Sequence, residues 1–292
     1  MGKDYFESSP VARDVFETAN RVLGWDLAAV CFNGPDDRLN QTDVSQPAIY
    51  VTSVASFRAA RDAGVIDPAA ATAYAGLSLG EYTALHLAGV FSFEDGLRLV
   101  AARGRYMQEA AVATPSGMVA VLGADKAAVA RLCDEAAGGD VLVAANYNAP
   151  GQIVVSGSRA ACERALKAAE AAGLRATALK VAGAFHSPLM QPAADRMEAE
   201  LAGAEFRPPA TDVYSNVTAA AHRDVESIKR LLVEQIVSPV LWEDTMVKLI
   251  GAGEGRFVEL APGRTLAGLA KRINRRLPIE SLATVEGLKA KA

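Results

Sequence analysis

The sequence predicts an α/β protein in which a smaller β-α-β-β-α-β unit is inserted into a larger alternating chain. Short apolar runs alternate with segments of helical periodicity along most of the sequence, as expected for layered α/β proteins. No low-complexity linker separates these parts, so a second domain has to be inserted rather than appended. With 292 residues, 51% of them hydrophobic, the chain can form one large domain or two of ordinary size.

The larger, alternating part consists of helices and short strands on both sides of the insert. Helices are predicted at residues 9–23, 46–63, 80–88, 93–111, 188–201 and 225–236. Strands are predicted at residues 71–75, 212–215 and 256–259. The strand at residues 71–75 leads directly into a glycine-rich turn.

Residues 117–183 are predicted to form the inserted unit, which leaves residues 1–116 and 184–292 for the larger part. Its helices follow Asp125 and Ser158, both good N-cap residues, and Gly173 suits a C-cap. Its strands are predicted at residues 117–122, 140–145, 152–156 and 174–181, with a turn over residues 146–151. This order of elements is that of a ferredoxin-like split β-α-β module.

Composition and charge exclude several classes of function. The 30 basic and 34 acidic residues give a net charge of −4, which offers no reason to expect a nucleic-acid or membrane partner. The three cysteines, Cys31, Cys133 and Cys162, are too far apart to predict a disulfide framework or a metal site. Neither a signal peptide nor a membrane-spanning apolar run is evident, so we expect a soluble, cytoplasmic protein.

A Gly-x-Ser-x-Gly motif at residues 76–80 is the strongest catalytic signal in the chain. It lies between a predicted strand and a predicted helix, where this motif forms a nucleophile turn that exposes the serine, here Ser78. Side chains larger than those of Gly76 and Gly80 are expected to collide with neighbouring backbone. The N–H of Leu79, at the helix start, is placed to donate to a developing oxyanion. An ordinary glycine-rich turn is the alternative.

A serine nucleophile needs a base, and the chain contains three histidines. His86 lies two turns along the helix that follows Ser78 and is expected to be a packing or surface residue. His222 lies in a polar loop and is expected to be solvated. His186 lies just after Phe185, where the insert returns to the larger part, and a helix-starting proline follows. By elimination His186 is the best candidate, with a structural role as the alternative.

The positions of two charged residues, Glu81 and Arg103, do not by themselves decide whether these residues have a catalytic or a structural role. Glu81, in the first turn of the helix, is expected to complement the helix dipole rather than to act in catalysis. Arg103 lies on the helix predicted at residues 93–111 together with Arg98 and Arg105. Its spacing favours a solvated surface position, and nothing in the spacing distinguishes it from its neighbours.

Six short motifs are individually common but specific in combination. They lie at residues 76–82, 103–110, 146–152, 183–187, 235–242 and 259–263. In this order, over essentially the whole chain, they resemble the malonyl-CoA:acyl carrier protein transacylase family. The resemblance implies an α/β-hydrolase-like larger subdomain with an inserted ferredoxin-like subdomain, in agreement with the order of predicted elements.

The resemblance also implies roles for individual residues. Ser78 corresponds to the acyl-accepting nucleophile, His186 to its general base, and Arg103 to the arginine that pairs with the malonyl carboxylate. Gln235 matches a residue whose backbone carbonyl orients the histidine, and Phe185 resembles the malonyl-selecting form of its loop. The implied reaction is ping-pong transfer from malonyl-CoA to the phosphopantetheine thiol of acyl carrier protein, in fatty-acid biosynthesis and without a metal or cofactor.

The chain departs from the family pattern at two places. Leu77 stands where the family usually has histidine. The family also begins with a buried strand and a Gly-Gln-Gly-Ser-Gln loop, which supplies a second oxyanion donor, whereas residues 1–7 resemble the segment after that loop. We therefore expect a longer native product, and weak activity and poor solubility otherwise, because one such donor contributes about 2.7–4 kcal/mol. The alternatives are a serine esterase or thioesterase, and an impaired carrier-protein-binding remnant.

Overall fold

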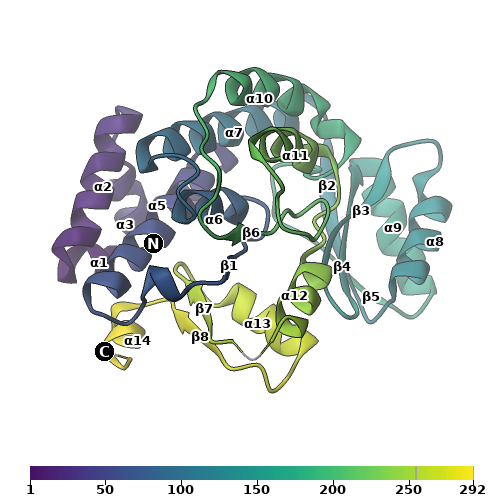
Figure 1. Ribbon diagram of the computed structural model, residues 1–292. Coiled ribbons are helices and arrows are strands. Elements are labelled where there is room, and N and C mark those ends of the chain that lie inside the picture. The colour runs from purple at the N-terminus through teal and green to yellow at the C-terminus, as the bar shows by residue number, and fades with distance from the viewer. Residues whose placement is uncertain (254, 292) are drawn as a thin grey trace. The chain divides into compact units, whose positions relative to one another are not determined.

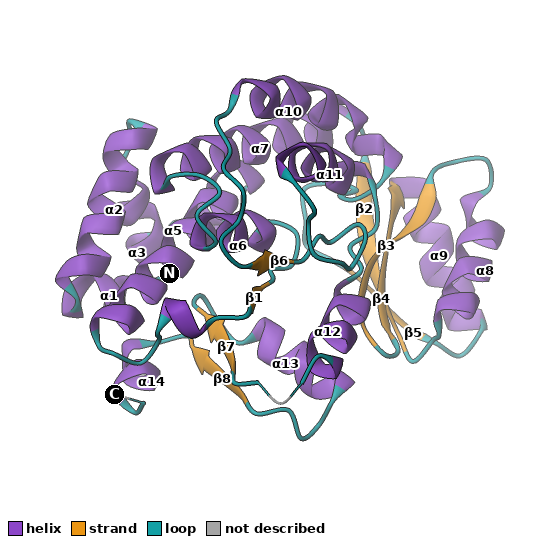
Figure 2. Ribbon diagram, viewed as in Figure 1, coloured by secondary structure: helices purple, strands orange, loops and turns teal. Residues whose placement is uncertain are grey.

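The computed structural model describes residues 1–253 and 255–291 and confirms the mixed α/β class (Figures 1 and 2). The chain divides into two compact units. The first comprises Met1–Gly104, Ala204–Tyr214 and Ala252–Ala292, and the second comprises Arg105–Gly203 and Ser215–Gly251. None of the described helices is long and apolar enough to cross a lipid bilayer.

Helices dominate the start of the first unit. They are α1 (Lys3–Ser8), α2 (Pro10–Leu23), α3 (Leu27–Asn33), α4 (Asp36–Leu39) and α5 (Thr42–Asp62). The central helix is α5, which is buried on most sides and therefore lacks a clear polar face. Helix α2 packs against α5 through Ala12, Val15, Phe16 and Ala19, whose spacing places them on one face.

Two short parallel strand pairs follow in the first unit. Strand β1 (Ala73–Tyr74) pairs with β6 (Asp212–Val213), and β7 (Phe257–Leu260) pairs with β8 (Ile279–Leu282). The other elements are η1 (Pro68–Ala70), α6 (Gly80–Leu87), α13 (Thr265–Ile273) and α14 (Val285–Lys289). Helix α7 (Phe93–Ala113) contributes residues to both units. The turn between β1 and α6 contains the predicted nucleophile.

The second unit contains a four-stranded antiparallel sheet with the order β3-β4-β2-β5. Its elements are β2 (Ser116–Leu122), α8 (Lys126–Ala137), β3 (Leu142–Ala149), β4 (Gln152–Ser158), α9 (Arg159–Ala171) and β5 (Arg175–Ala178). Both helices lie on the same side of the sheet (Figure 2) and share an apolar core with it. Chain order and strand order together confirm the predicted ferredoxin-like topology.

The second unit contains four further helical elements, and the segment that joins the last two is bonded to the edge strand β3 of this sheet. They are η2 (Pro188–Met190), α10 (Gln191–Gly203), α11 (Val225–Val237) and α12 (Trp242–Gly251). Val240, between α11 and α12, forms two backbone hydrogen bonds of 2.9 Å with β3, through Ala145 and Tyr147. Lys126 Nζ also lies 2.8 Å from Asp244 Oδ1. The limits of the inserted subdomain, residues 117 and 183, stay a prediction.

Several elements differ from the sequence prediction. Strand β3 continues to Ala149, so residues 146–149 are paired rather than turned, and two irregularities in the pairing accommodate them. The turn is limited to Pro150 and Gly151, where Gly151 has a positive φ. The prediction missed α1, α3, α4, α12, α13, α14 and β8. Such short elements form mainly because they pack on the rest of the protein, which local propensity does not report.

Two glycines that face each other across β2 and β4 give a direct test of packing in the sheet. A Cβ at Gly157 would overlap the backbone carbonyl of Val141, whereas one at Gly117 would meet open space. We expect Gly157→Ala to lower the free energy of unfolding by about 1–3 kcal/mol and Gly117→Ala to change it by less than about 0.5 kcal/mol. Urea denaturation of both variants measures this difference, and equal stabilities would contradict it.

Candidate active site

Ser78 lies in the turn between β1 and α6 and has a backbone φ of +51°. Ser78, His186 and Ala219 are the non-glycine residues with positive φ in the described part of the chain. Such conformations cost about 1–3 kcal/mol and are concentrated at functional sites. Two of these three residues are the predicted nucleophile and the predicted base.

The turn around Ser78 explains one of its two glycines. A Cβ at Gly76 would overlap the backbone carbonyl of Gly80, so only glycine fits there. A Cβ at Gly80 would meet no atom within 4 Å, so the expected collision at that position is wrong. The N–H groups of Gly80 and Glu81 donate to turn carbonyls, whereas the Leu79 N–H donates to no group among the described residues. This N–H is thus an available donor beside the serine.

Arg103 on α7 is only 1% exposed, so the predicted surface position is wrong. Its Nη2 donates to Ser78 Oγ at 3.0 Å, and its Nη1 donates to Gln46 Oε1 at 2.6 Å. The guanidinium carbon also lies 5.7 Å from the centre of the Tyr82 ring. Burial lowers the pKa of Arg103, while Tyr82 and Glu81 oppose that shift. Arginine stays protonated at any physiological pH, so a fixed cation lies beside Ser78.

Gln46 and Glu81 extend this buried polar cluster. Sequence reasoning missed Gln46, which is 6% exposed on α5 and accepts the hydrogen bond from Arg103. A polar residue on a helix that is buried almost all round was the available signal, but its partner lies 57 positions away. Glu81 lies in the first turn of α6 as expected, yet it is fully buried, which a role toward the helix dipole alone does not explain.

His186 lies in the second unit, in the loop between β5 and η2, and is 3% exposed. Its φ is +58°, and its Nδ1 lies 2.7 Å from the backbone carbonyl of Gln235 on α11. Since a carbonyl only accepts hydrogen bonds, Nδ1 carries the proton and Nε2 is left as the basic nitrogen. The loop is held by the Ala184 N–H, which donates to Ser116 Oγ at 3.1 Å, and by Ser187 Oγ, which donates to the Ala184 carbonyl at 2.6 Å.

Phe185 packs on the sheet of the second unit, against Met118, Ala145 and Val154. Met118 alternates along β2 with Val119, which belongs to the core under α8 and α9. Phe185 therefore covers the sheet face that is turned away from those helices. The side chain of Phe185, next to His186, is thus held by packing, while its backbone N–H donates to the Gly183 carbonyl at 3.1 Å.

The comparisons with known proteins decide the family. A family model described as the acyl transferase domain matches residues 1–289. The chain belongs to this acyl transferase family. It is 41% identical over 274 residues to the malonyl CoA-acyl carrier protein transacylase of Escherichia coli (strain K12), a match that covers 94% of this chain and 88% of the relative.

Solved structures of malonyl transacylases resemble this acyltransferase closely. The malonyl CoA-acyl carrier protein transacylase from Coxiella burnetii matches with a TM-score of 0.95 and 37% identity, over 99% of this chain and 91% of that one. A malonyl-transacylase in complex with its type II polyketide synthase acyl-carrier protein also has a TM-score of 0.95, with 39% identity, over 100% and 94% of the two chains. These matches confirm the fold class predicted from the motifs.

The predicted site residues of this acyltransferase fall into two groups. Ser78, Leu79 and Arg103 belong to the first unit, and Phe185, His186 and Gln235 to the second.

The other two histidines of the chain are not among the predicted site residues. His86 packs between aromatic rings and contacts the Phe91 carbonyl, as expected, whereas His222 is 9% exposed, so its predicted solvation is wrong. In the described ranges, no three His, Cys, Asp or Glu side chains are grouped as a metal would require.

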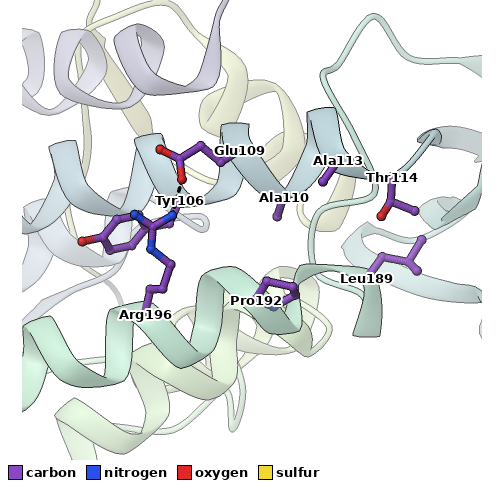
Figure 3. A pocket seen from close by; sticks show the side chains of 8 residues that line it. All are labelled: Tyr106, Glu109, Ala110, Ala113, Thr114, Leu189, Pro192 and Arg196. Carbon is purple, nitrogen blue, oxygen red and sulfur yellow. Dashed lines mark hydrogen bonds and ion pairs between the residues drawn. The ribbon is translucent and has the colours of Figure 1, made fainter.

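A pocket of about 220 Å³ lies in the second unit but contains none of the predicted site residues. It is lined by residues of the last turns of α7, by Thr114 just after that helix, and by residues of η2 and α10 (Figure 3). Arg196 lies over the Tyr106 ring at 3.7 Å and forms an ion pair with Glu109. The polar groups at this end of the pocket are therefore already engaged with one another.

The two glycines of the nucleophile turn differ in how well they tolerate a methyl group. We expect Gly76→Ala to lower the free energy of unfolding by about 1–3 kcal/mol and to abolish acyl transfer, because the added Cβ displaces the backbone at Gly80. Gly80→Ala serves as the matched control, since alanine is the better helix former and space is open. Thermal unfolding and acyl-transfer assays would refute this view if both variants behaved alike.

Proposed function

We propose that this acyltransferase moves the malonyl group from malonyl-CoA to the phosphopantetheine thiol of acyl carrier protein, through a malonyl-Ser78 intermediate. The observation that carries the proposal is the 3.0 Å hydrogen bond between Arg103 Nη2 and Ser78 Oγ. A buried cation beside a nucleophile suits an acyl donor that has a free carboxylate, which malonyl-CoA has and acetyl-CoA lacks. The names of the similar transacylases support the same substrates.

In the first half-reaction, His186 Nε2 takes the proton from Ser78 Oγ as the oxygen attacks the thioester carbonyl. The Oγ–C bond forms, the C–S bond breaks, and the proton passes from His186 to the departing thiolate of coenzyme A. The hydrogen bond from Nδ1 to the Gln235 carbonyl supports this assignment, because it fixes the tautomer and the orientation of the ring. A backbone carbonyl then takes the place that a carboxylate has in other serine enzymes.

The second half-reaction is the reverse with a different thiol. His186 takes the proton from the phosphopantetheine thiol, the sulfur attacks the ester carbonyl, and Ser78 leaves and recovers its proton. In both halves a negative charge develops on the carbonyl oxygen. The Leu79 N–H, which donates to no other described group, is the donor that we assign to this charge.

Arg103 is assigned to hold the malonyl carboxylate. In the structure its Nη2 donates to Ser78 Oγ, so an incoming carboxylate would accept that donor and release the hydroxyl for attack. Gln46 holds the other arm of the guanidinium through Nη1 and thereby fixes the plane of the fork. An acetyl group would leave a buried donor without its acceptor, which costs about 1–3 kcal/mol.

Phe185 is assigned to substrate selection next to the base. Its ring is fixed against Met118 and Val154, so it has little freedom to make room for an α-methyl branch on the malonyl group. The proposed reaction uses only side chains, backbone groups and the two substrates, and it requires no metal or cofactor. We place it in the cytoplasm and in fatty-acid synthesis, where malonyl thioesters are consumed.

A covalent intermediate on Ser78 is the first expected result. Incubation with malonyl-CoA should add one malonyl group to the protein, located on Ser78 by peptide mass spectrometry, and Ser78→Ala should show none. Addition of holo acyl carrier protein should then discharge the adduct to the carrier. Equally fast discharge to water without the carrier would favour a hydrolase, and a chain that never forms the adduct but still binds the carrier would favour a remnant.

The second expected result concerns the choice between acyl donors. Arg103→Ala should lower kcat/KM for malonyl-CoA. The loss should correspond to about 2–5 kcal/mol of transition-state stabilisation, because the substitution removes one partner of a buried charge pair. The ratio of acetyl to malonyl transfer should rise, and this ratio is independent of the amount of folded enzyme. Arg98→Ala, on the exposed side of the same helix, is the control. An unchanged ratio in Arg103→Ala and Arg103→Lys would remove Arg103 from this role.

A further inference from the structure

A buried tyrosine, Tyr82, lies against the guanidinium of Arg103 in the first unit. Arg103 Cζ lies over the Tyr82 ring, 5.7 Å from its centre. This is within the distance of about 6 Å at which a cation is attracted to the face of an aromatic ring. Tyr82 is fully buried and Arg103 almost fully, so water does not compete for the contact. The attraction is therefore stronger here than it is at a protein surface.

The contact with Arg103 is made by the ring of Tyr82 and not by its hydroxyl group. The hydroxyl oxygen is buried and forms no hydrogen bond with any described residue. Burial also raises the pKa of Tyr82 far above its ordinary value, so the phenol is neutral at physiological pH. A buried hydroxyl group without a partner destabilises the folded chain. What Tyr82 contributes to Arg103 is therefore the face of a neutral aromatic ring.

Tyr82 and the nucleophile Ser78 belong to the same short turn. Tyr82 lies in the first turn of α6, and its backbone N–H donates to the Leu79 carbonyl at 3.0 Å. The N–H of Glu81 donates to the Ser78 carbonyl at 3.2 Å. These two bonds hold the ring and the nucleophile in one rigid segment. The ring, as well as the hydrogen bond to Ser78 Oγ, therefore places Arg103 relative to the serine.

The ring restricts a movement of Arg103 that its two side-chain hydrogen bonds do not. Nη1 donates to Gln46 Oε1 and Nη2 donates to Ser78 Oγ, so both bonds are made at the edge of the guanidinium. In the proposed function, the malonyl carboxylate takes over the second bond while the Gln46 bond remains. A hydrogen bond at one arm does not stop the flat group from shifting, whereas a ring packed against the group limits that shift. The two donors of the fork then stay where a carboxylate needs them.

We propose that Tyr82 is a positioning residue, which holds the guanidinium of Arg103 beside Ser78 and thereby sets the preference for malonyl over acetyl groups. This inference rests on the proposed function. An acetyl group has no carboxylate for Arg103 to bind, so its transfer does not depend on where the guanidinium lies. Transfer of a malonyl group does. Loss of the ring therefore affects the two acyl donors unequally, which a merely structural role would not.

The test compares Tyr82→Leu and Tyr82→Phe with the wild type. Values of kcat/KM are measured for malonyl-CoA and for acetyl-CoA with the same thiol acceptor, pantetheine. Leucine keeps an apolar side chain without a ring, and we expect the malonyl-to-acetyl ratio of kcat/KM to fall about tenfold, mainly through KM for malonyl-CoA. The ratio does not depend on the amount of folded enzyme. Tyr82→Phe keeps the ring and should retain the ratio within about twofold, with no loss of thermal stability.

Tyr5→Leu is the matched control. Tyr5 is a fully buried tyrosine of the same unit, and its hydroxyl group donates to the Leu282 carbonyl at 2.8 Å. This variant should lose stability and leave the malonyl-to-acetyl ratio unchanged.

Three results would overturn the role of Tyr82 while the proposed function stands. They are an unchanged ratio in Tyr82→Leu, an equal fall in Tyr82→Phe, and an equal fall in Tyr5→Leu. The second of these would assign the role to the hydroxyl group instead of the ring. A wild type that forms no malonyl adduct on Ser78 would contradict the proposed function, and this inference with it.

Discussion

The burial of the Arg103 guanidinium is the constraint on which the first unit depends. A cation at 1% exposure is tolerated only where hydrogen bonds and nearby polar groups replace its hydration. The structure meets this requirement with Gln46 from α5 and Ser78 from the turn before α6. Three segments that are distant in sequence therefore have to converge on one side chain. The same arrangement that satisfies the arginine also presents a carboxylate-binding cation to the nucleophile.

Backbone strain is a second feature of the structure, found at Ser78 in the first unit and at His186 in the second. Ser78 and His186 both have positive φ values without being glycine, and each lies in a short loop that its surroundings fix. The Ser78 turn closes so tightly that only Gly76 fits against the start of α6. The His186 loop is held instead by hydrogen bonds from Ser187 and to Ser116. In both cases the rest of the unit supplies the stability that offsets the strain.

The ferredoxin-like sheet serves the candidate site as well as its own core. One face packs under α8 and α9, and the opposite face receives Phe185, the residue before His186. Its edge strand β3 is bonded to Val240, just beyond the end of α11, which carries Gln235. The sheet thus positions both the histidine loop and the helix whose carbonyl fixes the imidazole.

The sequence by itself determined the features that depend on residues close together in the chain. Asp125 and Ser158 cap α8 and α9 as predicted, the strand and helix order identified the module, and the Gly-x-Ser-x-Gly spacing located the turn. Tertiary structure alone decided the burial of Arg103, its contact with Gln46 and the burial of His222. Helical spacing gives equal weight to Arg98, Arg103 and Arg105, because it reports which residues share a face but not what covers that face. That cover comes from α5 and α6, whose approach depends on contacts between residues far apart in the chain.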